Sequence, residues 1–419
     1  MGKKEKAPCL RFKDTNGKDY PAWEQRKLGE LAATFGYGLN AAAKSFDGRH
    51  KYIRITDIDE STRRFLCSSL TSPDIDFEEA APYRLAEGDV LFARTGASVG
   101  KSYRYVRTDG DVYFAGFLIR FRFKDKEAAE FVFQNSLTAK FQNFIKTSSQ
   151  RSGQPGINAQ QFSGYQIAVP NSEERERIGS FFSRLDTAIT LHQRKLETLK
   201  KLKRTLLQKM FPKKGQLKPE LRFPGFTNDW EQRKLGELAA TFGYGLNAAA
   251  KSFDGRHKYI RITDIDESTR RFLCSSLTSP DIDFEEAAPY RLAEGDVLFA
   301  RTGASVGKSY RYVRTDGDVY FAGFLIRFRF KDKEAAEFVF QNSLTAKFQN
   351  FIKTSSQRSG QPGINAQQFS GYQIAVPNSE ERERIGSFFS RLDTAITLHQ
   401  RKLETYKKLK KSLLQKMFI

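Results

Sequence analysis

The chain has 419 residues, with 70 Lys and Arg against 49 Asp and Glu, a formal net charge of +21. Such a balance attracts polyanions, most commonly nucleic acid, although a basic ribosome-associated or simply soluble protein is the alternative. No apolar run is long enough to cross a membrane, and three cysteines, Cys9, Cys67 and Cys274, cannot build a disulfide framework. We therefore expect a cytoplasmic protein of a reducing compartment, neither membrane-bound nor disulfide-stapled.

The chain contains one sequence unit written twice. Residues Trp23 to Thr198 return without a substitution at Trp230 to Thr405, a displacement of 207 positions (230 minus 23). The tripeptide LRF at Leu10–Phe12 recurs at 221–223, so we interpret the short segment before Trp23 as the degenerate start of a repeat unit. This period is too long for a solenoid, and each copy has the size of an ordinary domain. We predict two folded domains with connectors.

The first part of each copy is predicted to be rich in β-structure. Alternating apolar and polar residues, or short β-branched and aromatic runs, indicate strands. They lie at 52–55, 90–93, 103–106 and 113–123, with an acidic loop between Pro73 and Pro82. Next, Phe133, Leu137, Phe141 and Phe144 have the spacing of one helical face. A short strand is then expected at 165–169.

A long helix is predicted from Ser172 to Met210. Asn171 is the expected cap and Glu174 its capping-box partner. Apolar residues then recur about every 3.5 positions, which indicates a coiled coil rather than a helix lying on a domain. The second copy has the same seam, so each helix should pair with the other. The pairing residues are Ile178, Phe182, Leu185, Ile189, Leu196, Ile385, Phe389, Leu392, Ile396 and Leu403.

The sequence has no motif that would carry catalysis. GASVGKS at 96–102 lacks the first glycine of a P-loop, because Thr95 stands there, and a strand-like segment follows it. The four histidines form two repeat pairs without metal-ligand spacing, and His192 falls on the helical seam as a polar core residue. Asp74 and Asp76 are better interpreted as an acidic loop than as nuclease carboxylates. We expect a non-catalytic chain with no metal site.

Basic residues interleaved with aromatic and small polar ones remain, a composition suited to DNA. Arg and Lys can neutralise phosphates, and Asn, Gln and Arg can read base edges. Any one of them could equally be a solvated charge on a strand. The predicted DNA-binding residues are Tyr37, Asn40, Lys44, Arg49, Lys51, Arg54, Arg94, Thr95, Lys101, Arg151, Gln154 and Asn158, and in the second copy Tyr244, Asn247, Lys251, Arg256, Lys258, Arg261, Arg301, Thr302, Lys308, Arg358, Gln361 and Asn365.

The order of these parts resembles one known family. The run from Gly156 to Pro212, beginning GINAQQFSGYQIAVPNSEERERIG, resembles the helical region of type I restriction-modification specificity subunits. YIRITDI at 52–58 and GDVLFARTGASVGK at 88–101 look like patches of their target recognition domains. The resemblance implies an α+β protein in which two long antiparallel helices separate two β-rich recognition domains about a pseudo-twofold axis.

The predicted boundaries follow from the repeat and this resemblance. They are a lead at 1–22, recognition domain 1 at 23–170, spacer helix 1 at 171–212, a linker at 213–229, recognition domain 2 at 230–377 and spacer helix 2 at 378–419. The resemblance also implies partners: double-stranded DNA, two modification subunits that bring S-adenosylmethionine and methylate adenine, and restriction subunits that cut DNA with ATP and Mg. The chain itself would need no cofactor.

One departure from the family pattern leads to a sharper hypothesis. Family members usually carry two different recognition domains, whereas these two are identical. Antiparallel helices would relate identical domains by a near twofold axis, which predicts inverted half-sites around a fixed spacer. Two alternatives remain: a stand-alone DNA-binding regulator and a fused restriction enzyme. The long helices argue against the first, and the missing catalytic motifs argue against the second.

Overall fold

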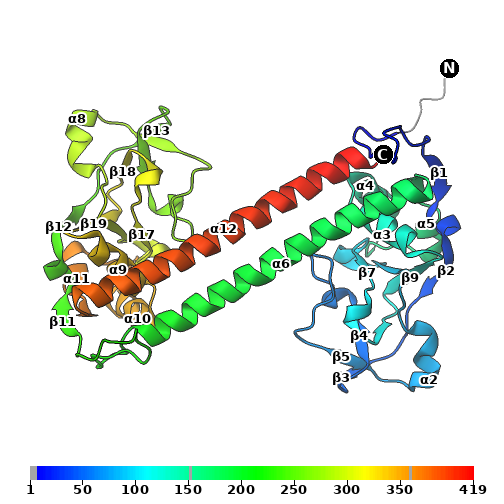
Figure 1. The fold of residues 1–419 in the computed structure, drawn as a ribbon, viewed down its shortest axis with the longest axis horizontal. Helices are drawn as coiled ribbons and strands as arrows, with labels where there is room; N and C mark the ends of the chain where they lie inside the picture. Colours follow the sequence, from blue (N-terminus) through cyan, green and yellow to red (C-terminus); the bar gives the residue numbers. More distant parts are fainter. Residues whose placement is uncertain (1–6, 151–152, 358–360) are drawn as a thin grey trace. The chain divides into compact units, whose positions relative to one another are not determined.

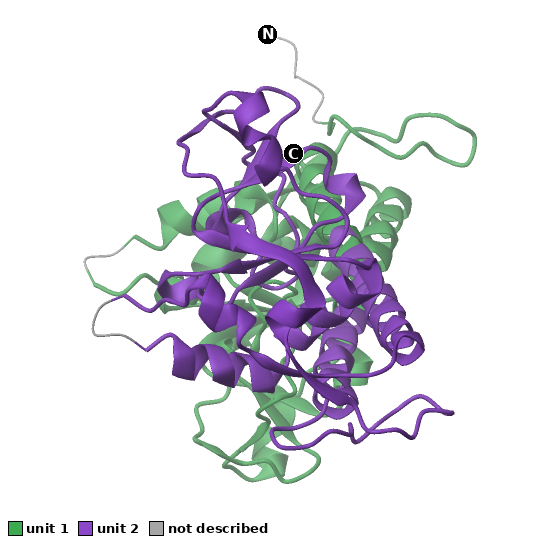
Figure 2. Cartoon of the chain, turned by 90° about the vertical axis from the view of Figure 1, so that its left-hand side faces the viewer, with its two compact units in different colours: residues 1–193, 402–419 green, residues 194–401 purple. Residues whose placement is uncertain are grey.

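The computed structural model describes residues 7–150, 153–357 and 361–419. The chain divides into two compact units: unit 1 contains residues 1–193 and 402–419, and unit 2 contains residues 194–401 (Figure 2). Each unit holds one copy of the repeated domain. The two long helices, α6 (Ser172–Met210) and α12 (Ser379–Met417), each contribute one part to either unit (Figure 1). The predicted α+β class with repeated domains and long helices is confirmed.

The repeated domains of the two units have the same elements in the same order. In unit 1 they are β1 (Glu24–Lys27), α1 (Leu28–Leu31), β2 (Ala32–Tyr37), β3 (Ala43–Ser45), β4 (Lys51–Ile53), β5 (Thr71–Pro73), α2 (Phe77–Ala80), β6 (Asp89–Ala93), β7 (Ser102–Arg104), β8 (Val112–Phe114), β9 (Leu118–Phe123), α3 (Lys126–Asn135), α4 (Ala139–Ser148), α5 (Ala159–Ser163) and β10 (Gln166–Val169). In unit 2 they are β11 (Glu231–Lys234), α7 (Leu235–Leu238), β12 (Ala239–Tyr244), β13 (Ala250–Ser252), β14 (Lys258–Ile260), β15 (Thr278–Pro280), α8 (Phe284–Ala287), β16 (Asp296–Ala300), β17 (Ser309–Arg311), β18 (Val319–Phe321), β19 (Leu325–Phe330), α9 (Lys333–Ser343), α10 (Ala346–Ser355), α11 (Ala366–Ser370) and β20 (Gln373–Val376).

A four-stranded antiparallel sheet, in the order β2-β9-β6-β7, lies at the centre of the repeated domain in unit 1. All of β6 is buried, because both faces of the sheet are covered. Since side chains alternate along a strand, Val90 and Phe92 join the core formed with the helices, whereas Leu91 and Ala93 join a second core on the opposite face. Unit 2 repeats this sheet as β12-β19-β16-β17.

Three two-stranded pairings complete each domain. In unit 1, β1 pairs with β10 and β3 with β5, both antiparallel, and β4 pairs with β8 in parallel. The β1–β10 pair brings the start of the domain to its last strand, immediately before the long helix begins. The start of β1 and the start of α6 are therefore held together by backbone hydrogen bonds.

Two sequence predictions about local structure are wrong. The strand predicted at 113–123 is two strands, β8 and β9, in different sheets, because Leu118 N donates to Ala115 O (2.9 Å) and closes a turn. The helical face predicted through Phe133 and Phe144 belongs to two helices, α3 and α4. Thr138 divides them by capping α4, its side chain accepting a hydrogen bond from Phe141 N. Helix α2 also occupies part of the predicted acidic loop.

The predicted helix from Ser172 to Met210 is confirmed, and the side chain of Asn171 caps it by accepting a hydrogen bond from Glu174 N (2.9 Å). The predicted capping box is incomplete among the described residues. The Glu174 carboxylate is fully buried and accepts hydrogen bonds from Arg11 and from Trp23 Nε1. The residue expected to complete the cap instead anchors the segment before β1.

The helices run antiparallel within each unit. In unit 1, Asp186 of α6 lies 2.6 Å from Lys410 of α12, and the Phe182 and Phe418 rings lie 5.9 Å apart, so numbers rise along one helix as they fall along the other. Unit 2 shows the same direction, because Lys203 Nζ lies 2.6 Å from Asp393 Oδ1 and the Phe211 and Phe389 rings lie 6.1 Å apart. The antiparallel arrangement is therefore present in both units.

The seam is not a coiled coil along its whole length. All ten predicted pairing residues are buried, but Ile178 and Phe182 lie in the domain core, and the Phe131 ring of α3 lies 5.1 Å from the ring of Phe418, the residue after α12. Further along, Leu207 is buried, whereas Leu206, where a continued 3.5-residue repeat would place the seam, is only partly buried. A straight helix drifts relative to a 3.5-residue repeat, which accounts for this shift. The beginning of α6 is thus also a core helix of the domain.

Candidate nucleic-acid interface

Four predicted DNA-binding residues line one pocket in unit 1. Tyr37, Asn40, Arg54 and Arg94 come from distant parts of the sequence and surround a cavity of about 720 Å³. Unit 2 has the equivalent cavity, of about 730 Å³, lined by Tyr244, Asn247, Arg261 and Arg301. We call these cavities the reading pockets. Each is large enough for a small-molecule-sized group.

The floor of the reading pocket is fixed by backbone contacts next to β2. A Cβ at Gly38 would lie 2.3 Å from Ala115 O, so no larger residue fits there. The Tyr52 hydroxyl donates hydrogen bonds to Leu39 O (2.9 Å) and Ala41 O (3.2 Å). Burial raises the pKa of Tyr52, so the hydroxyl keeps the proton that it donates. The glycine and the tyrosine together hold the 38–41 backbone against the end of β8.

Arg94 is braced between two aromatic rings. Its guanidinium carbon lies 4.8 Å from the centroid of Tyr37 and 5.9 Å from that of Phe117, within the range of cation–π attraction. The Arg94 backbone N donates to Phe117 O (3.0 Å), and its O accepts from Ile157 N (2.9 Å). Arg301 lies over Tyr244 in the same way, at 4.7 Å. A permanently charged, planar group is therefore held at the pocket wall.

Arg54 also faces the pocket, but it carries its own counter-charge. Its Nε donates to Asp57 Oδ2 (3.0 Å) and its Nη2 to Asp57 Oδ1 (3.2 Å). The hydrogen bonds that Arg54 donates to Asp57 raise the pKa of Arg54 and orient its guanidinium. Arg261 and Asp264 repeat this pair. Arg94 is thus the pocket arginine for which the structure shows aromatic rather than acidic neighbours.

The predicted DNA-binding residues Thr95, Gln154 and Asn158 lie in two segments that contact each other next to Arg94. Thr95 bridges to Gly156, and Gly96 N donates to Pro155 O (2.9 Å). Asn158 caps α5 by accepting a hydrogen bond from Gln161 N (2.8 Å). Gln154 Nε2 lies close to Gly96. Their counterparts Thr302, Gln361 and Asn365 are arranged alike, whereas the predicted Arg151 and Arg358 lie outside the described residues.

The predicted lysines are outside the pocket lining, where two of them form ion pairs and the third donates to a backbone carbonyl. Lys44 lies 3.3 Å from Asp74, Lys101 lies 3.0 Å from Glu60, and Lys51 Nζ donates to Asp109 O. Their equivalents Lys251, Lys308 and Lys258 have the same partners in unit 2, Asp281, Glu267 and Asp316. Any role for these residues in binding phosphate would have to compete with existing contacts.

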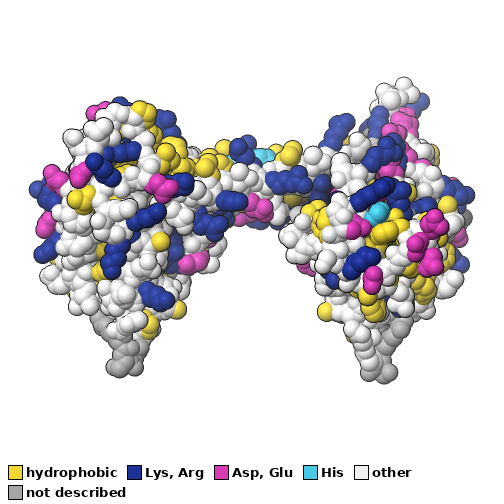
Figure 3. Space-filling model, turned by 90° about the horizontal axis from the view of Figure 1, so that it is seen from below, with side chains coloured by type: hydrophobic (Ala, Val, Ile, Leu, Met, Phe, Trp, Pro, Cys, Tyr) yellow, Lys and Arg dark blue, Asp and Glu magenta, His cyan; other side chains and the backbone are white. Residues whose placement is uncertain are grey.

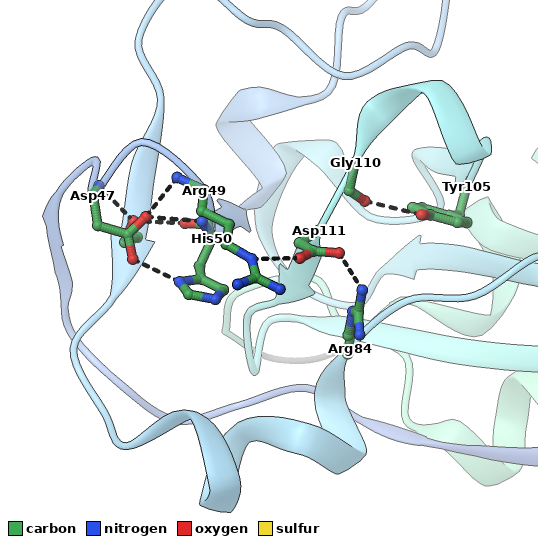
Figure 4. A network of polar contacts seen from close by, with 8 residues as sticks. Asp47, Arg49, His50, Arg84, Tyr105, Gly110 and Asp111 are labelled. Carbon is green, nitrogen blue, oxygen red and sulfur yellow. Dashed lines mark hydrogen bonds and ion pairs between the residues drawn. The ribbon is translucent and has the colours of Figure 1, made fainter.

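Arg49 belongs to a surface network of this kind (Figure 4). Its Nε donates to Asp111 Oδ2 (3.1 Å), and Arg84 pairs with the other oxygen of the same carboxylate. Nearby, hydrogen bonds from Arg49 N and from His50 outweigh the opposing effect of burial and lower the pKa of Asp47 well below its usual range. Arg256, Asp318 and Arg291 repeat the first network in unit 2. The network stiffens this edge of the domain.

Phe117 and Phe324 are pocket residues that the sequence analysis missed. They lie in the turns between β8 and β9 and between β18 and β19, and their side chains are 60% and 63% exposed. The signal was the dipeptide Gly116-Phe117 inside a run interpreted as one continuous strand. A glycine there should have indicated a break.

Charge is spread over both units. Figure 3 shows Lys and Arg side chains across the visible face of each unit and on the helices. Among the described residues, no group of three His, Cys, Asp or Glu could hold a metal ion, and no helix has the length and apolarity required to span a bilayer. His192 lies against a ring, 5.4 Å from Tyr406.

Comparison with known proteins gives consistent relatives. A family model described as the type I restriction modification DNA specificity domain matches residues 21–201 and again 227–408. The type I restriction enzyme MjaVIII specificity subunit of Methanocaldococcus jannaschii is 21% identical, over 78% of this chain and 77% of its own length. The MjaX specificity subunit of that organism is 27% identical over 54% of this chain, and the match spans only 55% of that relative.

The fold has a close counterpart among solved structures. The crystal structure of a type I restriction-modification system S subunit from M. genitalium superposes with a TM-score of 0.69, over 99% of both chains, at 13% identity. At this identity the likeness concerns the fold alone. Because the two domain matches together cover most of the sequence, the chain belongs to the family of type I restriction modification DNA specificity domains.

Proposed function

We propose that this chain is the subunit that gives a type I restriction-modification complex its DNA sequence specificity, by reading a target made of two separated half-sites. The observation that carries the proposal is the duplication of one basic, aromatic-lined reading pocket in two copies of a DNA specificity domain. Arg94 and Arg301 are the main candidate base-reading groups, since their guanidinium planes are braced by rings.

The half-sites should be identical and inverted. Identical domains read identical base sequences, and antiparallel helices of equal length favour a twofold relation between them. Sequencing for methylated adenine after co-expression with a modification subunit would reveal the target. We expect an inverted repeat with a spacer of constant length, and two unrelated half-sites would refute the symmetric target.

Catalysis would belong to partner subunits. We expect two modification subunits, which bring S-adenosylmethionine and methylate adenine, and restriction subunits that use ATP and Mg. Exposed leucines support a docking role for the helices: Leu191 and Leu202 lie on one face of α6, about three turns apart, and α12 repeats them as Leu398 and Leu409.

Purification of the chain with and without a modification subunit separates this function from its alternatives. The chain alone should neither methylate nor cleave DNA, and the complex should methylate a defined sequence. Methylation or cleavage by the single chain would indicate a fused enzyme. Tight, sequence-specific binding by the chain alone, unchanged by the modification subunit, would indicate a regulator.

Paired substitutions separate base reading from phosphate binding. Arg94→Ala with Arg301→Ala should relax specificity at one position of each half-site, by about 1–3 kcal/mol each. If a phosphate displaces the acidic partners of Lys44 and Lys251, then Lys44→Ala with Lys251→Ala should weaken binding uniformly and reduce its salt dependence, because these lysines lie outside the pocket lining. Equal effects of the two pairs on every sequence would remove Arg94 from the base-reading role.

A further inference from the structure

We infer that each reading pocket takes up one base that leaves the DNA helix and stacks on Phe117 in unit 1 or on Phe324 in unit 2. The inference rests on the proposed DNA-reading function and adds the chemical nature of the pocket's occupant, an unstacked nucleobase of the bound half-site. It follows from the exposure of the two rings, from the rigidity of the turns that carry them and from the charge beside them.

Phe117 is exposed although its backbone is immobilised. Gly116 N donates to Leu39 O (2.8 Å), Phe117 O accepts from Arg94 N (3.0 Å), and the turn closes at Leu118. The ring is nevertheless 60% exposed, and Phe324 in the second copy is 63% exposed. A large apolar ring at the rim of a cavity, presented to solvent by a hydrogen-bonded turn, supplies the kind of aromatic wall that ligand pockets use.

The lining of the pocket suits an unstacked base. Tyr37, Tyr52 and Phe117 supply aromatic surface, and the charge of Arg94 lies between the first and the last of these rings. Aromatic rings stack on any base, and an arginine beside them can hydrogen-bond the edge of that base. The cavity of about 720 Å³ has room for a nucleotide unit of the strand.

A base that stays within the duplex cannot use this surface. In paired DNA the grooves present base edges, whereas the ring faces are covered by their neighbours. A face becomes available to Phe117 only when the base has left the stack. That step costs least at a mismatched or damaged pair, which gives the inference a direct readout.

The test uses the complete complex of this chain with modification subunits and its preferred DNA sequence. A single mismatch is moved through one half-site, and 2-aminopurine replaces each adenine in turn. We expect one position, distinct from the methylated adenine, where the mismatch tightens binding and 2-aminopurine fluorescence changes. Phe117→Ala should abolish both effects in its half-site and weaken binding about 5- to 150-fold.

The duplication supplies matched controls. Phe324→Ala should produce the same loss in the other half-site, and Phe117→Tyr should retain binding because it keeps the ring. Leu66→Ala with Leu273→Ala removes two other exposed apolar side chains, both 39% exposed and outside the pockets, and should change nothing. Thermal unfolding of each variant checks folding, and Phe117→Tyr separates loss of the ring from loss of the fold.

Each outcome decides something definite. A wild-type complex that prefers a sequence, but whose mismatch profile and affinity are the same in the Phe117→Ala and Leu66→Ala variants, would overturn this inference and leave the proposed function intact. A wild-type complex without any sequence preference would overturn both. A signal at the methylated adenine that survives Phe117→Ala would belong to the modification subunits and would not support the pocket.

Discussion

In each unit, a short segment binds the last turn of one long helix and the first turn of the other. The contacts are the same in the two units, but the segments lie at different distances along the chain from the helices that they bind. In unit 1, Leu10 N donates to Lys416 O (2.9 Å) in the last turn of α12, and Arg11 binds Glu174 in the first turn of α6. In unit 2, Leu221 N donates to Lys209 O (2.8 Å) in the last turn of α6, and Arg222 binds Glu381 of α12. We call residues 10–12 and 221–223 the straps.

The difference lies in sequence distance. The strap of unit 2 follows the helix end that it binds after a short segment, whereas the strap of unit 1 and the end of α12 lie at opposite ends of the sequence. Both straps nevertheless place a phenylalanine against the start of a helix, Phe12 against Phe181 at 5.8 Å and Phe223 against Phe388 at 6.0 Å. The contacts of the strap residues, rather than the length of chain between strap and helix, therefore hold each strap against its helices.

Removing the buried carboxylate that binds the strap should have the largest effect. Glu174 accepts hydrogen bonds from Arg11 (2.7 and 2.8 Å) and from Trp23 Nε1 (3.0 Å), and Glu381 accepts the matching bonds from Arg222 and Trp230. Glu174→Ala leaves the part-buried Arg11 guanidinium without its charge partner and the Trp23 Nε1 without its acceptor, which costs about 3–5 kcal/mol. Denaturant unfolding of Glu174→Ala and Glu381→Ala should show similar losses. A much smaller loss in unit 2 would mean that the nearby connection compensates.

The ion pairs between the helices should matter less. Lys410 pairs with Asp186 in unit 1 and Lys203 with Asp393 in unit 2, and both pairs are partly exposed. Lys410→Met and Lys203→Met should each lower the free energy of unfolding by about 1–3 kcal/mol. A double-mutant cycle with Asp186→Asn measures the coupling. Additive single effects would show that the pair contributes no interaction energy of its own.

Glu130 and Glu337 provide a pH-dependent comparison with a smaller effect. Burial raises the pKa of Glu130 despite the nearby Arg104, and Glu337 behaves alike. A raised folded-state pKa stabilises the protein below the ordinary glutamate pKa, and this contribution is lost as the pH rises through the folded value. Glu130→Gln, uncharged throughout, should therefore be more stable than wild type at neutral pH. The advantage should shrink as the pH falls, and an advantage that grows on acidification would contradict this assignment.

Cutting the linker inside unit 2, between the end of α6 and the strap of that unit, should have the smallest effect. If contacts rather than connection close each unit, a specific protease site placed at 213–216 should leave both fragments associated after cleavage. Size-exclusion chromatography and DNA methylation by the complex would measure this. Methylation should stay close to that of the uncut protein with the same inserted site, and dissociation of the fragments would show that the linker holds unit 2 together.

The sequence predicted the long regular elements better than the short ones. Helix α6 was predictable because its periodicity extends over many turns and Asn171 gives it a definite start. The α3–α4 break was not predicted, because Thr138 caps a new helix without disturbing the apolar spacing. The burial of Leu207 also depends on the partner helix and on the domain surface, which the sequence of one helix does not specify.

The candidate site was predictable in composition but not in grouping. Tyr37, Asn40, Arg54 and Arg94 meet in one pocket as expected for a binding set. Arg49 instead forms an ion pair with Asp111, which is 62 positions away in the sequence, and the residues around Arg49 do not predict such a distant partner. Phe117 was missed because the run around it was interpreted as one continuous strand, although Gly116 marks a break in it.

Gly38 affects how such a protein could acquire a new target. Because a Cβ at this position would collide with Ala115 O at 2.3 Å, the backbone beneath the pocket tolerates no other residue, and Gly245 is under the same restriction. Side chains such as Asn40, beside that backbone, and Thr56, from the turn at 55–57, line the pocket. Substitutions of the side chains that line the pocket can therefore change its chemistry one position at a time, while the backbone beneath it stays the same.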